Sequence, residues 1–270
     1  MTDLEKKVSQ SVRLIRSVNR CSDVIIAYSG GKDSDVIRSL CIEAKVPFRM
    51  VYNSTTIDPP GTINRNLSLG AVINRPKKTF LQLVAKKGLP SINRRFCCEV
   101  LKEQYIAPRL LLGIRREESV KREKRYVEPT ACRIFSKKKY CDQIYPILFW
   151  SNEDIKTYIE GMNVKVHPLY YSDGQFDINR RLGCIGCPLQ GDRGKRDFLQ
   201  YPKMLRQWVK AYTQYVNTHK AVEGIYEDVL WHLFYSNHGN EKYNQNLHGL
   251  FEAPNAKELL EDYFHVDLTI

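Results

Sequence analysis

The chain has 270 residues, a net charge of +12, 43% hydrophobic residues and a mean hydropathy of −0.43. This length suffices for one substantial α/β domain with a helical appendage, and the composition is that of a soluble globular protein. No apolar run approaches membrane-spanning length and the opening MTDLEKKVSQ has no signal-peptide core, so we expect a cytoplasmic protein without a membrane partner.

Helical and extended patterns alternate along the first two thirds of the chain, which predicts a parallel sheet with right-handed crossovers. Residues 3–19 form an amphipathic pattern, with Asp3 as the expected helix cap. The remaining expected elements are strands at 24–28, 48–52 and 110–114, a further strand in PILFW (146–150), and helices from the first glycine loop to 44, at 79–87 and at 151–161.

The pattern changes after the GCIGCP turn (183–188), where only helical periodicity remains. Residues 201–217 and 222–235 predict two helices, and Asn255 with Glu258 predicts the cap of a short third one. The sequence therefore predicts an α/β domain over residues 1–194 and a C-terminal helical extension over 195–270.

The buried strand at 24–28 ends in SGGKDS, which leads directly into an amphipathic helix. Gly30 and Gly31 allow a sharp turn and let backbone amides approach a ligand without an obstructing Cβ. Helix N-terminal amides and the ammonium of Lys32 favour phosphate. The spacing is not that of the Walker loop, so a different phosphate-binding loop is predicted, with a plain strand-to-helix turn capped by Ser29 as the alternative.

Two further loops are expected at the same edge of the sheet, because the carboxyl ends of parallel strands meet there. Asp58, after the second strand, could hold a Mg²⁺-phosphate or a ribose hydroxyl, or could open an Asp-Pro-Pro turn. Arg115, Arg116 and Arg122 follow the third strand with Ser119 among them. Their guanidinium groups could clamp phosphate or sulfate, and a solvated charged helix is the alternative.

Eight cysteines are present, and in a cytoplasmic chain cysteines serve more often as ligands or catalysts than as disulfides. Cys21 and Cys41 fall on helical patterns and are expected to be packing residues. Four thiolates suit either an iron–sulfur cluster or structural zinc. The other six cysteines are grouped as Cys97-Cys98, Cys132 with Cys141, and Cys184-x-x-Cys187.

SGGKDS resembles the PP-loop of the N-type ATP pyrophosphatases, and roughly residues 20–200 resemble the 3′-phosphoadenylyl sulfate (PAPS) reductase family. The resemblance implies a parallel, doubly wound, adenine nucleotide alpha hydrolase-like sheet and an adenine nucleotide ligand, either ATP or an adenylyl sulfate (APS or PAPS). The matching segments, in chain order, are YSGGKDS, TTIDPP, RRFCCEVLK, LLGIRREES, YPILFWSNEDI, HPLYY and RLGCIGCP.

The expected site residues follow from these segments. Lys32, Asp33 and Arg115 are the expected catalytic residues, with Asp33 helping to hold Mg²⁺ beside ATP. The expected nucleotide-binding residues are Ser29, Gly30, Gly31, Lys32, Asp33, Ser34, Asp58, Gly113, Arg115 and Ser119.

The adjacent pair Cys97-Cys98 (the tandem) and the later pair Cys184-x-x-Cys187 (the CxxC pair) resemble the pattern by which the adenylyl-sulfate branch of the family holds a [4Fe-4S] cluster. The resemblance therefore implies such a cluster on Cys97, Cys98, Cys184 and Cys187, with zinc as the alternative metal. Cys132 and Cys141 could replace two of these ligands, form a redox pair, or be surface thiols. Flanking basic residues, which either bind an anionic substrate or neutralise thiolates, are Arg95, Lys102, His167 and Arg181.

Two departures separate this chain from the assimilatory reductases of that family. Those enzymes carry a nucleophilic cysteine near the C-terminus, whereas no cysteine follows Cys187 here; they also lack the complete loop signature, which is intact here. We therefore expect an ATP-using enzyme that transfers AMP to an acceptor and uses the cluster in sulfur transfer. Its expected partners are a sulfur donor or reductant protein and a nucleic-acid acceptor.

Two alternatives remain open. One is a sulfonucleotide reductase that releases sulfite and takes its missing thiol from Cys132, Cys141 or a partner. The other is a basic nucleic-acid-binding module with structural zinc, for which the discriminating feature is aromatic residues among basic ones. Such residues occur in YPKMLRQWVKAYTQY, where helical spacing favours core packing.

Overall fold

The structure is a computed structural model that describes residues 1–19, 24–104, 106–136, 139–219, 224–236 and 255–269. Contacts divide the chain into two compact units: unit 1 comprises residues 1–54, 60–75 and 104–182, and unit 2 comprises residues 55–59, 76–103 and 183–270. Both units draw on segments far apart in sequence. The proposed domain boundary between residues 194 and 195 stays a prediction.

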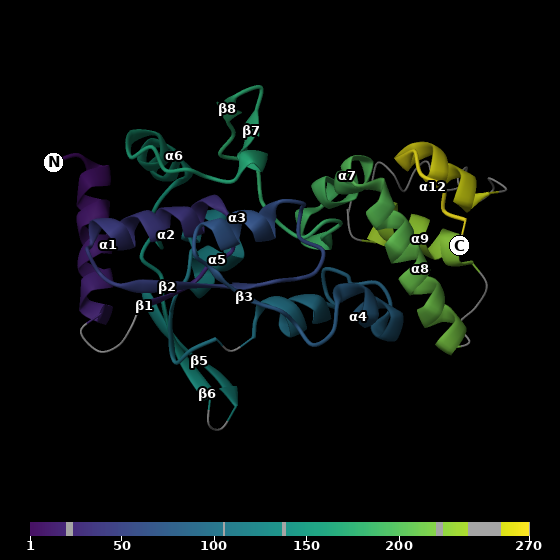
Figure 1. The fold of residues 1–270 in the computed structure, drawn as a ribbon, viewed down its shortest axis with the longest axis horizontal. Coiled ribbons are helices and arrows are strands. Elements are labelled where there is room, and N and C mark those ends of the chain that lie inside the picture. Colours follow the sequence, from purple (N-terminus) through teal and green to yellow (C-terminus); the bar gives the residue numbers. More distant parts are fainter. Residues whose placement is uncertain (20–23, 105, 137–138, 220–223, 237–254, 270) are drawn as a thin grey trace. The chain divides into compact units, whose positions relative to one another are not determined.

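Unit 1 is built on a six-stranded sheet in the order β3-β2-β1-β4-β6-β5, in which all neighbours are parallel except β5 and β6 (Figure 1). This confirms the predicted α/β class with a mostly parallel sheet. A separate two-stranded ribbon joins β7 (Tyr171–Ser172) to β8 (Gln175–Phe176). The sheet strands are β1 (Val24–Ala27), β2 (Phe48–Asn53), β3 (Val72–Asn74), β4 (Arg109–Leu111), β5 (Thr130–Ser136) and β6 (Lys139–Ile144).

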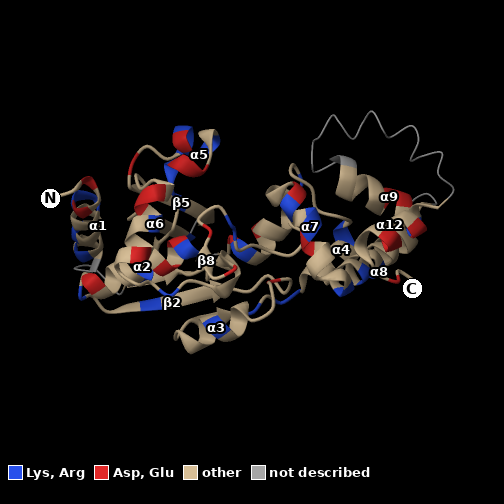
Figure 2. Cartoon of the chain, turned by 90° about the horizontal axis from the view of Figure 1, so that it is seen from above, with Lys and Arg blue, Asp and Glu red and all other residues tan. Residues whose placement is uncertain are grey.

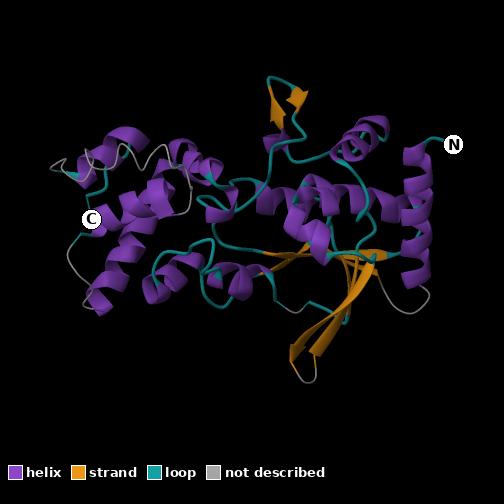
Figure 3. Cartoon of the chain, turned by 180° about the vertical axis from the view of Figure 1, so that it is seen from behind, coloured by secondary structure: helices purple, strands orange, loops and turns teal. Residues whose placement is uncertain are grey.

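Helices α1 and α2 pack on β1, and α2 also contacts α6; Figure 3 shows α2 and α6 on one side of the sheet. The main core of unit 1 lies there, because Val24 and Ile26 point into it with the apolar faces of these helices. The alternate residues Ile25 and Ala27 are half-buried against a smaller cluster. The helices of unit 1 are α1 (Asp3–Asn19), α2 (Lys32–Glu43), α3 (Thr62–Ser68), α5 (Val120–Arg125) and α6 (Asn152–Gly161).

The strand order places a topological switch point at β1. The chain runs outward from β1 to β2 and β3, then returns to the other side of β1 with β4. Ile26 of β1 is paired with Leu111 of β4, so the loops that follow these two strands begin side by side. Ligands of open α/β sheets bind at such a point.

The sequence misassigned two local features of unit 1. PILFW is a buried turn and not a strand: Leu148 N donates to Tyr145 O and Trp150 N to Ile147 O. The first helix is capped by Thr2, whose Oγ1 accepts from Glu5 N, and not by Asp3. The predicted capping box of α6 is confirmed, because Ser151 and Asp154 exchange hydrogen bonds.

Unit 2 is helical and has its own core. Trp208 lies at its centre, 4.8 Å from the ring of Phe80 and 5.3 Å from that of Phe198. No helix in the described ranges is long and apolar enough to cross a bilayer. The helices are α4 (Phe80–Lys87), α7 (Asp192–Gln200), α8 (Pro202–His219), α9 (Ile225–Trp231) and α12 (Ala256–Phe264), with a π-helical turn at Cys98–Lys102.

A buried polar network supports the loop after β1. Asp35 on α2 is only 2% exposed; it accepts hydrogen bonds from the Tyr28 hydroxyl and from Arg65 Nη2 at 3.0 Å. Arg65, on α3, also donates to Gly30 O and to Lys165 O. Burial raises the pKa of Asp35 to about 6, although Arg65 and Tyr28 act in the opposite direction.

Asn66, the next residue of α3, is fully buried beside the same loop. A Cβ on Gly30 would lie 2.7 Å from Asn66 Oδ1, so the amide is packed against the glycine. Among the described residues, neither polar atom of the Asn66 side chain has a hydrogen-bond partner. A buried amide without partners costs stability, and the packing leaves no room for a side chain at Gly30.

The raised pKa of Asp35 predicts how stability varies with pH. The folded state binds the Asp35 proton more tightly than the unfolded state does. The protonated residue therefore contributes fully to stability below about pH 4, and this contribution is lost as the pH rises through about 6. Over this range the free energy of unfolding should fall by up to about 3 kcal/mol. Asp35→Asn removes this dependence. Urea unfolding of both proteins from pH 4 to 7 checks it, and parallel curves for parent and variant would contradict it.

The buried amide of Asn66 predicts a stabilising substitution. Asn66→Leu has nearly the same shape and removes both unpartnered atoms, so we expect the free energy of unfolding to rise by about 1–3 kcal/mol. Urea unfolding at constant pH measures the change, with Asn66→Ala as the control that leaves a cavity. An Asn66→Leu protein less stable than the parent would mean that the amide has partners in solution.

Candidate functional site

The loop after β1 has the geometry of an anion site. Gly30 has φ = +73°, and Gly31 is the extended N-cap of α2 without a side-chain cap. Ser29 Oγ accepts from Gly31 N at 3.2 Å, and Ser34 Oγ donates to Gly31 O at 2.7 Å. Within the described chain, the amides of Gly30 and Asp33 have no hydrogen-bond acceptor. Such amides at a helix N-terminus suit phosphate.

Lys32 lies at this helix start and is only 6% exposed. Its amide donates to the Tyr170 hydroxyl at 3.2 Å, and its Nζ lies 3.2 Å from Asp33 Oδ2 and 5.6 Å from the Tyr170 ring centroid. The ammonium is thus held beside the loop by one carboxylate and one aromatic face. Sequence reasoning did not assign Tyr170 to the site, because 138 positions separate it from Lys32 along the chain.

Asp33 connects the loop after β1 to the loop after β4. Arg115 Nε donates to Asp33 Oδ1 at 2.8 Å, and the Arg115 side chain is 2% exposed. A Cβ on Gly113 would lie 3.1 Å from Asp33 Cβ, so glycine permits this approach. The predicted residues Ser29 to Ser34, Gly113 and Arg115 are therefore brought together in unit 1.

Arg115 makes further contacts with protein acceptors. Nη2 donates to Asn152 Oδ1 at 2.8 Å and Nη1 to Trp150 O at 3.3 Å. Its guanidinium is committed to these groups and to Asp33. These contacts support a positioning role for Arg115, and the phosphate clamp stays a prediction.

Three other predicted contacts are used locally. Asp58, in unit 2, accepts from Thr55 N at 2.9 Å and from Thr55 Oγ1 at 2.6 Å, so its carboxylate is bonded to a residue three positions earlier. Ser119 caps α5 by accepting from Arg122 N, and Arg122 pairs with Glu118 at 2.5 Å. For Arg122 the structure therefore favours the solvated charged helix over the clamp.

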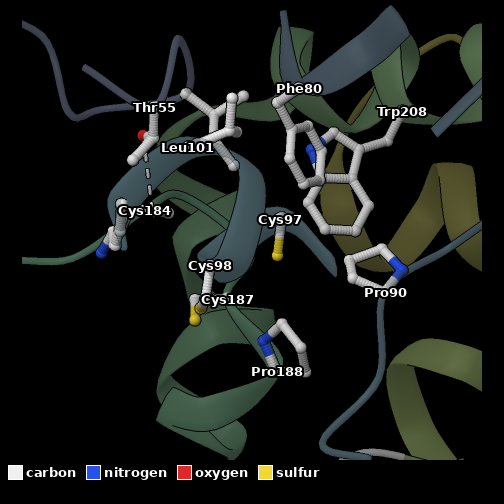
Figure 4. A pocket seen from close by; sticks show the side chains of 12 residues that line it. Thr55, Phe80, Pro90, Cys97, Cys98, Leu101, Cys184, Cys187, Pro188 and Trp208 are labelled. Carbon is white, nitrogen blue, oxygen red and sulfur yellow. Dashed lines mark hydrogen bonds between the residues drawn. The ribbon is translucent and has the colours of Figure 1, made fainter. Parts of the chain in front are cut away.

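The four cysteines of the tandem and the CxxC pair line one pocket in unit 2, with an empty volume of about 320 Å³ (Figure 4). Cys97 and Cys98 lie at the start of the π-helical turn, and Cys184 and Cys187 lie in the GCIGCP turn. Apolar and aromatic side chains form most of the remaining wall. Its members are Thr55, Ile57, Phe80, Pro90, Leu101, Lys102, Pro188 and Trp208.

The GCIGCP turn is fixed by α7. Gly186 has φ = +72°, and a Cβ there would lie 2.3 Å from Phe198 Cζ. Gly194 approaches Cys187 equally closely, since its Cβ would lie 2.3 Å from Cys187 O. Asp197 accepts a hydrogen bond from Gly186 N at 3.1 Å. Close packing of α7 therefore determines where Cys184 and Cys187 point.

The pocket stabilises thiolate charge unevenly. The pKa of Cys98 is lowered, because Cys97 hydrogen-bonds to its sulfur and Lys102 and Arg95 lie nearby, whereas the pKa of Cys97 is raised. Burial raises the pKa of Cys187 to about 11. Cys184 in turn raises the pKa of Lys102, a pocket residue whose side chain is partly exposed.

The four pocket thiols are the donors available to the metal expected from the sequence. Four thiols from two segments suit an iron–sulfur cluster or zinc. In the part of the chain that the structure describes, however, no three His, Cys, Asp or Glu side chains are arranged to hold a single metal ion. The four thiols line one pocket, and which group they hold stays a prediction.

The remaining cysteines do not join this pocket. Cys132 and Cys141 lie on the β5–β6 hairpin of unit 1, opposite Asp142 and Arg133 respectively. Adjacent strand positions face opposite sides, so the two thiols cannot form a disulfide without backbone movement. Cys141 is buried and Cys132 exposed; Cys41 is a core residue as predicted, and Cys21 lies outside the described residues.

His167 and Arg181 also belong to unit 1, whereas Arg95 and Lys102 lie in unit 2 with the four cysteines. His167 is 3% exposed, and its Nδ1 accepts from Leu169 N. Burial, together with Arg65, lowers the pKa of His167 to about 4. The imidazole is therefore neutral at pH 7, which corrects the expectation of a cation there.

Comparisons with known proteins agree with this architecture. The chain is 28% identical over 231 residues to an uncharacterized protein of Methanocaldococcus jannaschii, covering 77% of this chain but 45% of that protein, so it spans less than half of that relative. It is 24% identical over 208 residues to sulfate adenylyltransferase subunit 2 of Methylorubrum populi, covering 64% of this chain and 67% of the relative.

Solved structures give more distant likenesses. A PAPS reductase from Candida auris in a phosphate complex has a TM-score of 0.45 and 15% identity, covering 64% of this chain and 94% of that one. A U34-tRNA thiolase from Methanococcus maripaludis with its [4Fe-4S] cluster has a TM-score of 0.41 and 15% identity, covering 81% and 82%. The phosphoadenosine phosphosulfate reductase domain model matches residues 23–190, and this chain belongs to that family.

Proposed function

We propose that this chain binds Mg²⁺-ATP at the SGGKDS loop and transfers AMP to an acceptor, and that the cysteine pocket holds an iron–sulfur cluster used in sulfur transfer. The observation that carries the nucleotide half is the start of α2, where a glycine turn, amides without an acceptor in the described chain and the buried Lys32 belong to one loop. The expected site residues keep their proposed roles, and three of them, Asp58, Arg115 and Ser119, also make the contacts with protein groups described above.

In the proposed reaction an acceptor oxygen attacks the α-phosphorus of ATP, the bond to the bridging α,β oxygen breaks, and pyrophosphate leaves. The amides of Gly30 to Ser34 and the Lys32 ammonium stabilise negative charge on the leaving phosphates. Asp33 is held by Arg115 and exposes part of its carboxylate, so it can hold Mg²⁺. Catalysis here is positioning and electrostatic stabilisation.

In the proposed cluster site Cys97, Cys98, Cys184 and Cys187 are the ligands. The bound cluster would supply electron-transfer or sulfur-carrying chemistry. The ammonium of Lys102 balances part of the thiolate charge, and the apolar wall limits access of water. Zinc is the alternative occupant, because four thiolates suit it equally well on chemistry alone; the resemblance of the cysteine pattern to that of the adenylyl-sulfate branch favours the cluster.

A second candidate, a sulfonucleotide reductase, is favoured by one observation. Cys132 is exposed on the β5–β6 hairpin, whereas Cys141 is buried, so Cys132 is the accessible thiol of the pair. In that reaction the thiolate attacks the sulfur of the sulfonucleotide and the bond to the phosphate oxygen breaks. A dithiol then releases sulfite and leaves a disulfide.

The nucleotide proposal predicts the effect of removing the loop cation. Lys32→Ala should weaken binding of ATP at least tenfold, because a charge-assisted contact to phosphate is lost, and pyrophosphate should be the product of the parent when its acceptor is present. Calorimetry with ATP, with and without Mg²⁺, measures the affinity. Lys121→Ala, an exposed cation on α5, is the matched control.

Equal ATP affinity in parent and Lys32→Ala would reject the loop assignment. Sulfite release from an adenylyl sulfate in the presence of a dithiol, lost in Cys132→Ser and with no ATP binding, would establish the reductase instead.

The cluster proposal predicts metal content. Protein purified without oxygen should be brown and contain about four irons per chain. Serine at any of the four pocket cysteines should lower the iron content, whereas Cys132→Ser should not, because that thiol belongs to unit 1. One zinc and no iron per chain would support the structural-metal alternative.

A further inference from the structure

Two segments of unit 2 are strongly basic and contain no carboxylate side chain. Residues 76–98 include α4, and residues 198–219 include α8; neither segment has an Asp or Glu. α4 and α8 pack against each other, and Figure 2 shows blue but no red residues on both helices. The exposed cations of the two segments are Lys77, Lys78, Lys86, Lys87, Arg94, Arg95, Lys203, Arg206 and Lys210.

An open groove lies beside these helices, lined by residues 88–94, α8 and α9, with an empty volume of about 940 Å³. Three aromatic side chains line it: Tyr212, Tyr215 and Trp231. Trp231 is 49% exposed, and Ile92 on the facing segment is 45% exposed. A groove with so much exposed apolar and aromatic surface suits a flat ligand.

The aromatic rings on α8 form a ladder. Tyr212 and Tyr215 are stacked at 18° with centroids 5.8 Å apart, and the His219 ring lies 4.2 Å from Tyr215. The spacing i, i+3, i+7 keeps them on one side of the helix. The core side of α8 is formed chiefly by Trp208, Val209 and Val216. Tyr212 is half-buried and also packs against this core, whereas Tyr215 is half-buried and His219 is exposed.

We propose that this groove binds single-stranded nucleic acid. Unpaired bases stack on aromatic rings in a sequence-tolerant way, and Trp231 is the exposed ring of this groove, at the side of the half-buried Tyr212 and Tyr215. The surrounding Lys and Arg side chains neutralise the phosphates. Asp228, the one carboxylate among the groove residues, accepts a hydrogen bond from the Tyr212 hydroxyl at 2.7 Å. The proposal rests on unit 2 alone and does not depend on ATP binding.

The test uses the full chain and fluorescein-labelled 12-nucleotide RNA and DNA strands of mixed sequence, with the matching duplexes, in anisotropy titrations at several salt concentrations. The single strands should bind more tightly than the duplexes. Tyr215→Ala should weaken binding of the single strands about tenfold, and Tyr215→Phe should retain it because the ring remains. Lys210→Glu should weaken binding and lower the salt slope, whereas Lys121→Glu on α5 should not.

If Tyr215→Ala does not fold, Trp231→Ala tests the same proposal, because the Trp231 side chain is about half exposed and its removal should not disturb the core. We expect Trp231→Ala to weaken binding of the single strands several-fold. Equal affinity for strands and duplexes, unchanged by both aromatic substitutions, would overturn the proposal and leave only a polyanion-attracting surface. Binding of poly-glutamate as tight as that of RNA would overturn it equally.

Discussion

The ion pair between Asp33 and Arg115 joins the two loops on which the candidate nucleotide site depends. Asp33 follows β1 and Arg115 follows β4, the neighbouring strands at the switch point of the sheet. A carboxylate that bridges Lys32 and Arg115 fixes the start of α2 against the loop after β4. Buried ion pairs of this kind give orientation more readily than net stability. Here the orientation is what a phosphate cradle requires.

A second layer of polar contacts lies beneath the loop. Arg65 connects α3 to Asp35 and to the carbonyl of Gly30, and the hydroxyl of Tyr28 completes the network. The raised pKa of Asp35 and the unpartnered amide of Asn66 show that this arrangement has a cost in stability. A protein keeps such groups where geometry matters more than stability, which supports a functional role for the loop.

Local pattern predicted the parts of the fold that local forces determine. The helix over residues 3–19 and the strand from residue 24 follow from periodicity, and the glycine turn follows from the backbone freedom it needs. PILFW was misassigned because an apolar run is equally compatible with a buried turn, and Pro146 lacks the amide that a strand would use. β3 was missed because three residues carry too little pattern.

The residues of the candidate nucleotide site also fall into those with a local sequence signal and those without one. Gly30, Gly31 and Lys32 could be identified from the loop itself, but Arg65, Asn66 and Tyr170 reach it from distant segments and carry no local signal. Arg115 was found by its place after a strand, whereas its role depends on Trp150 and Asn152, which sequence spacing does not connect to it. The choice of these four cysteines came from the resemblance to the adenylyl-sulfate branch of the family, and the structure places the four in one pocket. The fixing of their turn by α7 was not predicted.

The distribution of charge changes the meaning of the net +12. Sequence reasoning assigned several of these charges to a nucleotide site, yet Arg65 and Arg115 are paired with Asp35 and Asp33 inside unit 1. The loop therefore presents chiefly Lys32 to a phosphate. Counted along the sequence, unit 1 has 26 Lys and Arg against 16 Asp and Glu, whereas unit 2 has 16 against 14, so unit 1 carries +10 of the net charge and unit 2 carries +2. Within unit 2, the exposed cations of α4, α8 and their flanks lie on segments without carboxylates, and the acidic residues lie on other segments of that unit. A local concentration of cations of this kind attracts a polyanion. The nucleic-acid proposal for unit 2 therefore depends on where the charges of that unit lie and not on the net charge of the chain.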